Sequence, residues 1–81
     1  MNKREYHQEA VKELLKLRRD LYGMEAKAIK TAKRVRACLK AGNREQAEAH
    51  RAAAENMAMV VDFIRVQISV INGDLAKVLA A

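Results

Sequence analysis

The chain contains no proline and only three glycines, so nothing forbids α-helix over most of its 81 residues. It also lacks tryptophan, and only 4% of its residues are aromatic, which leaves aliphatic side chains and alanine to build a core. A core of this kind suits helices packed closely on one another better than a pocket for a small molecule. At this length the chain holds one domain at most.

Cysteine is equally scarce. Cys38 is the single cysteine, so no internal disulfide can form, and the Cys and His residues do not have the spacing of a metal site. The sequence has no glycine-rich phosphate loop, no paired-carboxylate pocket and no nucleophile elbow, and His7 and His50 lie far apart. We therefore predict no enzyme activity, no catalytic residue, no cofactor and no metal.

Long apolar runs are missing as well. The most apolar window, residues 57–71, is too short for a membrane span and contains Asp62, Arg65 and Gln67. The first residues are polar, and no apolar stretch of the signal-peptide kind follows them. We expect a cytoplasmic protein that meets membranes only at their surface.

The segment Ala41-Gly42-Asn43 breaks the helical pattern, and several features of it predict a turn. Glycine is preferred just past the end of a helix because it accepts the left-handed backbone conformation. Asn43 can cap the next helix, with Glu45 in its first turn, where an acid suits the helix dipole. The sequence therefore predicts two helices, over about residues 3–41 and 44–80, with Gly23 and Gly73 as tolerated interior glycines.

Apolar and small residues recur along both predicted helices in alternating steps of three and four, the heptad pattern of a coiled-coil seam. The first seam comprises His7, Ala10, Leu14, Leu17, Leu21, Met24, Ala28, Thr31, Val35 and Cys38. The second comprises Ala47, His50, Ala54, Met57, Val61, Ile64, Ile68, Ile71, Leu75 and Val78. When the chain folds back at Gly42, the seams meet in register if facing residue numbers sum to 85. We therefore predict an all-α single domain over residues 1–81, a long antiparallel two-helix hairpin roughly 55 Å long.

The second helix has more apolar surface than one partner helix can cover. Five residues lie off the seam at helical spacing: Met59, Val60, Phe63, Val66 and Val70. A helix that is apolar nearly all round is normally buried, and a contiguous exposed apolar patch usually marks an interface. Two explanations stay open, a third helix beyond this sequence or packing on other copies or related subunits. We assign the five residues to self-assembly.

The charged residues are also distributed unevenly between the two halves of the chain. Residues 1–41 hold 12 Lys/Arg and 5 Asp/Glu, a formal charge of +7, and residues 42–81 hold 4 and 5, which gives −1. The basic stripe on the side of the first helix away from its seam comprises Lys12, Lys16, Arg19, Lys27, Lys30, Lys33, Arg34 and Lys40. Such a stripe suits the phosphates of lipid or nucleic acid, although an ordinary solvated face has the same composition. Few aromatics accompany the stripe, which argues against stacking on single-stranded nucleic acid and leaves the choice between lipid and nucleic acid open.

Residues 33–68, KRVRACLKAGNREQAEAHRAAAENMAMVVDFIRVQI, resemble the hairpin tip of the ESCRT-III family, the charged multivesicular body proteins. The positions that line up with the family pattern without a gap are Lys40, Gly42, Asn43, Glu45, Ala47, His50, Ala54, Ile64 and Ile71, and Val35, Cys38 and Leu39 match apolar positions before the tip. Members of that family continue into further helices and an acidic tail that recruits an ATPase. The resemblance therefore identifies this sequence as a hairpin fragment or a minimal relative.

The resemblance implies a filament-forming, membrane-remodelling subunit whose hairpins stack side by side, with the basic first helix against an acidic membrane. Two alternatives stay open, a small coiled-coil subunit of a protein complex and a basic hairpin that binds nucleic acid without sequence preference. Binding to acidic liposomes, a closed oligomer of fixed stoichiometry and salt-dependent binding to duplex DNA distinguish the three.

The apolar patch generates a first prediction. Phe63→Asp should abolish assembly while leaving helicity largely intact, because the substitution places a charge in the patch and not in the hairpin seam. Electron microscopy measures the assembly, and circular dichroism measures the helicity. Assembly that persists would mean that Phe63 lines the hairpin and that the register is wrong.

Overall fold

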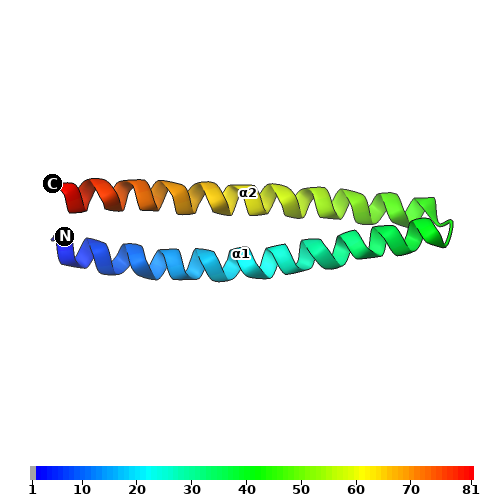
Figure 1. Ribbon diagram of the computed structural model, residues 1–81, viewed down its shortest axis with the longest axis horizontal. Coiled ribbons are helices and arrows are strands. Elements are labelled where there is room, and N and C mark those ends of the chain that lie inside the picture. Colours follow the sequence, from blue (N-terminus) through cyan, green and yellow to red (C-terminus); the bar gives the residue numbers. More distant parts are fainter. Residues whose placement is uncertain (1) are drawn as a thin grey trace.

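The computed structural model describes residues 2–81 and consists of two long helices lying side by side in opposite directions (Figure 1). Helix α1 spans Lys3–Lys40, and helix α2 spans Arg44–Ala80. Both helices continue through their interior glycines, Gly23 and Gly73. The result is a rod of 59 × 15 × 15 Å with the two chain ends together at one end and the turn at the other. The predicted all-α antiparallel hairpin is confirmed.

The turn is built around Gly42, whose φ of 76° lies in the left-handed region. The backbone N–H of Gly42 donates to the Leu39 carbonyl at 3.1 Å, and the N–H of Asn43 donates to the Cys38 carbonyl at 2.8 Å. This pair of bonds around a left-handed glycine is a Schellman motif, which satisfies carbonyls that the end of a helix otherwise leaves without partners. The last turn of α1 therefore ends in a fully defined geometry.

Each helix begins at an asparagine cap. The Asn2 side-chain oxygen accepts a hydrogen bond from the Glu5 N–H at 2.9 Å, and the Glu5 carboxylate accepts from the Asn2 side-chain amide at 3.3 Å. At α2, the Asn43 side-chain oxygen accepts from the Gln46 N–H at 3.1 Å. Asn43 thus closes α1 with its backbone and opens α2 with its side chain, which confirms its predicted capping role.

The interface between the helices follows the two predicted seams. Every seam residue except His7 is buried or half-buried, and the most buried residues are Ala10, Leu14, Thr31, Ala47, Val61 and Ile64. His7 is exposed instead, because it lies at the open end of the rod, where α2 is in its last turns. Within residues 2–81 no large side chain is completely enclosed, since each helix covers the other on one side only.

Side-chain contacts across the interface show how the seams interlock. Cys38 Sγ lies 4.0 Å from the side-chain oxygen of Gln46, one residue before its predicted partner. The Thr31 hydroxyl donates to the Lys27 carbonyl at 2.9 Å and lies 3.5 Å from Met57 Sδ. The summed register pairs Met57 with Ala28, so this contact connects adjacent seam layers, as expected when side chains of one helix fit between those of the other.

The turn and an interior glycine make a matched pair of substitutions. Gly42→Ala should lower the free energy of unfolding by about 1–2 kcal/mol, because alanine is strained in the left-handed region. Gly73→Ala should raise it by up to about 1 kcal/mol, because a Cβ there meets open space within a helix. Urea titration followed by circular dichroism at one fixed protein concentration measures both. Equal effects of the same sign would contradict the described turn.

Candidate functional site

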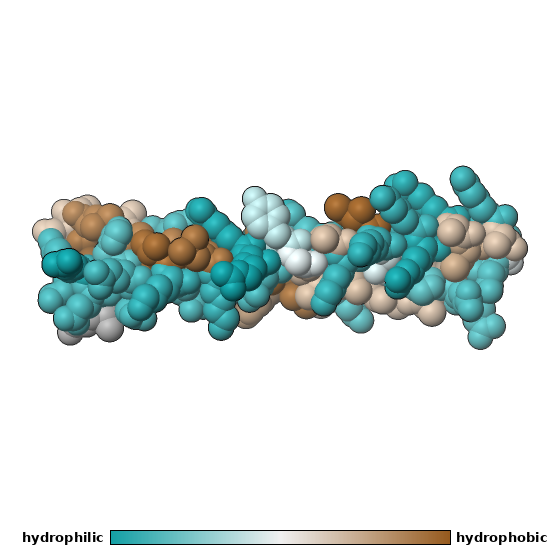
Figure 2. Space-filling view, turned by 90° about the horizontal axis from the view of Figure 1, so that it is seen from below, coloured by the Kyte–Doolittle hydropathy of each residue, from teal (hydrophilic) through white to brown (hydrophobic). Residues whose placement is uncertain are grey.

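The predicted basic stripe lies entirely on the surface. All eight of its side chains are exposed, and Figure 2 shows the side of the rod that α1 presents, where polar side chains cover most of the length with apolar patches between them. The ion pairs within residues 2–81 are Lys12–Glu9 at 3.4 Å, Arg51–Glu48 at 3.1 Å and Arg65–Glu25 at 3.0 Å. Of the stripe, therefore, only Lys12 has an acidic partner in this part of the chain.

The positive charge is concentrated at the tip half of the rod, which we define as residues 26–55. This half holds eight Lys/Arg and three Asp/Glu, a formal charge of +5, whereas the remaining residues, the open half, hold eight and seven, which gives +1. Between Ala26 and Asn43 there is no acidic residue at all. The segment contributes six cations, which are Lys27, Lys30, Lys33, Arg34, Arg36 and Lys40.

These six cations do not form ion pairs within the described residues, so their field is not neutralised locally. Because the helix fixes their spacing, they present a rigid array of donors over the last four turns of α1. Fixed charges of one sign raise the local concentration of ions of the opposite sign. The arrangement can therefore hold phosphate or carboxylate groups on an extended partner.

The five apolar residues assigned to self-assembly are all exposed on α2, with exposed fractions between 42% and 69%. They lie on the turns between the basic tip half and the open end, and Val60, the least exposed of them, lines a groove together with Met24 and Lys27 of α1. Scattered apolar side chains on a surface are ordinary, but a set at consecutive helical positions forms a continuous face. This face is the second candidate surface of the molecule.

Sequence reasoning missed three apolar residues on α1. Leu15, Tyr22 and Ile29 are each more than half exposed and recur every seven residues, so they form a line along the helix. Their seven-residue spacing was visible in the sequence, but the stronger pattern of the seam concealed it. Polar and basic neighbours separate them from one another, so they do not form a continuous patch.

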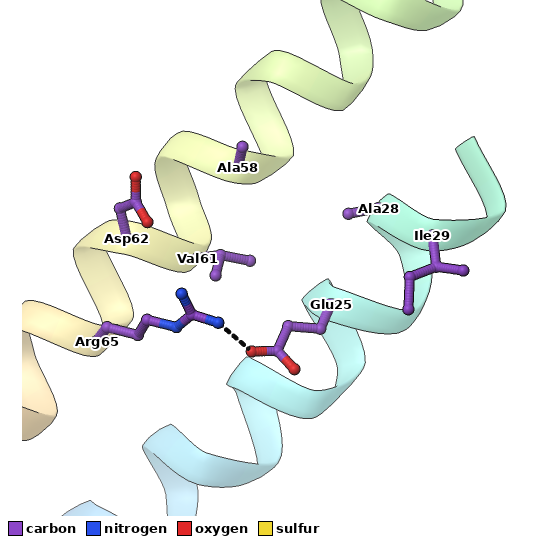
Figure 3. Close-up of a pocket in the computed structure, with 7 residues that line it drawn as sticks. All are labelled: Glu25, Ala28, Ile29, Ala58, Val61, Asp62 and Arg65. Atoms are coloured by element: carbon purple, nitrogen blue, oxygen red, sulfur yellow. Dashed lines mark hydrogen bonds and ion pairs between the residues drawn. The ribbon is translucent and has the colours of Figure 1, made fainter. Parts of the chain in front are cut away.

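The groove beside this line holds the one ion pair that connects the two helices in the described part of the chain (Figure 3). The Arg65 guanidinium of α2 donates to the Glu25 carboxylate of α1 at 3.0 Å, at one end of the groove that Val61, Ala28 and Ala58 also line. Asp62 also lines the groove and lies on the same helix as Arg65. The groove is open and mainly apolar, so we interpret the pair as a link between helices rather than a reactive site.

Two structural findings concern other kinds of site. Among residues 2–81, His, Cys, Asp and Glu side chains do not gather in groups of three that could hold a metal ion. In the same range, neither helix is long and apolar enough to cross a membrane.

Compared with known proteins, the chain matches no family model, no curated protein sequence and no solved structure. The resemblance to the ESCRT-III family therefore stays a prediction that rests on the residues around Gly42.

The groove yields a prediction about stability. Glu25→Gln should change the free energy of unfolding by less than about 1 kcal/mol, because ion pairs in contact with solvent contribute little. Ile64→Ala should lower it by about 2 kcal/mol or more, because Ile64 is buried in the seam. Both variants can be measured by urea denaturation at the same protein concentration. A larger loss for Glu25→Gln than for Ile64→Ala would reverse the order of contributions that we infer.

Proposed function

We propose that this chain is a structural subunit that self-associates through the exposed apolar face of α2 and binds an acidic membrane surface through the basic side of α1. The observation that carries the proposal is the segment from Lys27 to Lys40, which holds six cations, no acid and no ion pair within residues 2–81. The finer role, a filament that remodels the membrane, is what the ESCRT-III resemblance adds.

Electrostatics support a membrane surface as the partner. A basic residue close to an anionic leaflet contributes about 1 kcal/mol, and the attraction falls off within a Debye length. One hairpin with a few cations near the headgroups therefore binds weakly. Hairpins joined through α2 bind more tightly where the joined copies meet the same surface, because each additional contact becomes intramolecular. The two surfaces thus support one function, in which assembly and membrane binding strengthen each other.

The charge distribution along the rod makes the proposal specific to the tip half. The open half is close to neutral because its cations alternate with Glu5, Glu9, Glu13, Asp20 and Glu25. An anionic surface is therefore attracted to the tip half and hardly at all to the open half. We infer that the rod meets the membrane with its tip half, over residues 27–40 of α1, and that Lys12, Lys16 and Arg19 of the basic stripe contribute little to this binding.

A pair of charge reversals tests this. Lys30→Glu/Lys33→Glu should weaken binding to vesicles of phosphatidylcholine with about 30% phosphatidylserine by at least about tenfold, because each cation contributes about 1 kcal/mol. The matched control, Lys12→Glu/Lys16→Glu, changes the net charge equally but lies in the open half. Co-sedimentation at about 50 mM and about 500 mM salt measures both, and binding by the unaltered chain should fall at the higher salt.

Any one of three results would contradict the proposal. The chain fails to bind acidic vesicles at low salt, it binds pure phosphatidylcholine vesicles equally well, or the two double variants lose the same amount of vesicle binding. The same titration with duplex DNA in place of vesicles serves as a comparison. Tighter binding to DNA than to the acidic vesicles would favour the nucleic-acid alternative.

A further inference from the structure

A second heptad seam runs along the back of α2. It comprises Ala49, Ala52, Asn56, Met59, Phe63, Val66, Val70 and Gly73, which follow one another in alternating steps of three and four. Each member lies two residues after a member of the seam that packs on α1, and two residues turn about 200° around a helix. The second seam therefore faces almost directly away from α1. All eight members are exposed, and none is charged.

We propose that this second seam packs on the same seam of a second copy, as an antiparallel α2–α2 contact about a twofold axis. The inference rests on the proposed self-association and adds its partner, direction and register. In the resulting dimer the helices lie in a row, with the two copies of α2 in the middle and the two copies of α1 outside.

Charge selects α2 rather than α1 as the surface on which the second seam packs. The equivalent positions of α1, two residues after its own seam, include Lys12, Lys16, Arg19, Lys30 and Lys33. Burying these side chains against an apolar seam removes several charges from water without partners, which is strongly unfavourable. The uncharged back of α2 has no such penalty, so it is the surface that fits another copy of itself.

The area is sufficient for a stable contact. The exposed fractions of Met59, Phe63, Val66 and Val70 leave roughly 400 Å² of surface open on one copy, within the size range of the largest apolar patches on ordinary monomers. Two copies that bury these side chains together remove roughly 800 Å² from water, which approaches the roughly 1,000 Å² at which specific interfaces begin. Flanking small residues of the seam add to this area.

The direction follows from the charged tips. A parallel arrangement places two tip halves of +5 side by side, whereas an antiparallel one places them at opposite ends of the dimer. Like charges at short range repel, and the repulsion is strongest where no acid intervenes. A twofold antiparallel contact also closes on itself, so this seam joins two copies, and a filament would join such dimers through another surface.

The register follows from side-chain size and from Asp62. With Phe63 of one copy beside Val66 of the other, Met59 lies beside Val70, so all four large residues of the seam face large residues. A shift of one seam step toward the tip places the two copies of Asp62 opposite each other. We therefore place the twofold axis between Ile64 and Arg65.

The native cysteine provides the test. With a spin label on Cys38 of the unaltered chain, the antiparallel dimer places the two labels about 60 Å apart, from the helix rise and the separation of packed helices. A parallel dimer places them within about 35 Å. Light scattering gives the mass, and pulsed electron paramagnetic resonance gives the distance. Labelling an exposed cysteine in Cys38→Ala/Ala37→Cys repeats the measurement if the label on Cys38 reduces helicity.

Each outcome decides between the two proposals. A dimer with the long distance supports the antiparallel seam. A dimer with the short distance overturns this inference and leaves the proposed self-association standing, whereas a monomer at high concentration overturns both. Phe63→Asp should give the monomer, and Leu15→Asp is the matched control, because Leu15 is 59% exposed against 63% for Phe63 but lies on α1. If both variants become monomeric, the seam is not the contact.

Discussion

Two helices in contact can each cover only one stripe of side chains, and this geometric limit governs the whole molecule. At the seam, alanine, threonine and branched aliphatic residues lie between the helices and are covered. The apolar residues on the opposite side of α2 lie outside this stripe and stay exposed. Even in the seam, large side chains such as Ile68 and Ile71 remain half-buried. The hairpin is therefore well defined in shape and incomplete in burial.

The two sides left over have opposite chemistry. The back of α2 is uncharged over six turns, and the tip half of α1 has cations without acids. In a rod that is 15 Å wide, both surfaces remain exposed, the apolar one on α2 and the basic one on α1. Joining rods through α2 then leaves α1 outermost in every copy. The basic sides of the two α1 helices then face outward in opposite directions, so the contact covers neither of them.

The fold could be predicted from the sequence because its determinants are local or periodic. Gly42 and Asn43 specify the turn through backbone conformation and capping, and the heptad spacing specifies which stripe of each helix is covered. The ion pair between Glu25 and Arg65 could not be predicted in this way, because it depends on which turns lie beside one another at the edge of the interface. The exposure of His7 also depends on where the rod ends.

The turn at Gly42 also has a consequence for the order in which the chain folds. Contacts between the helices join residues that are close in sequence near the turn and progressively farther apart toward the chain ends, as Cys38–Gln46 and Glu25–Arg65 illustrate. Because short loops close at a smaller entropic cost than long ones, we expect the hairpin to form from its turn toward its termini. We expect opening to run in reverse, so that backbone amides near Lys3 and Ala80 exchange with solvent before those near the turn.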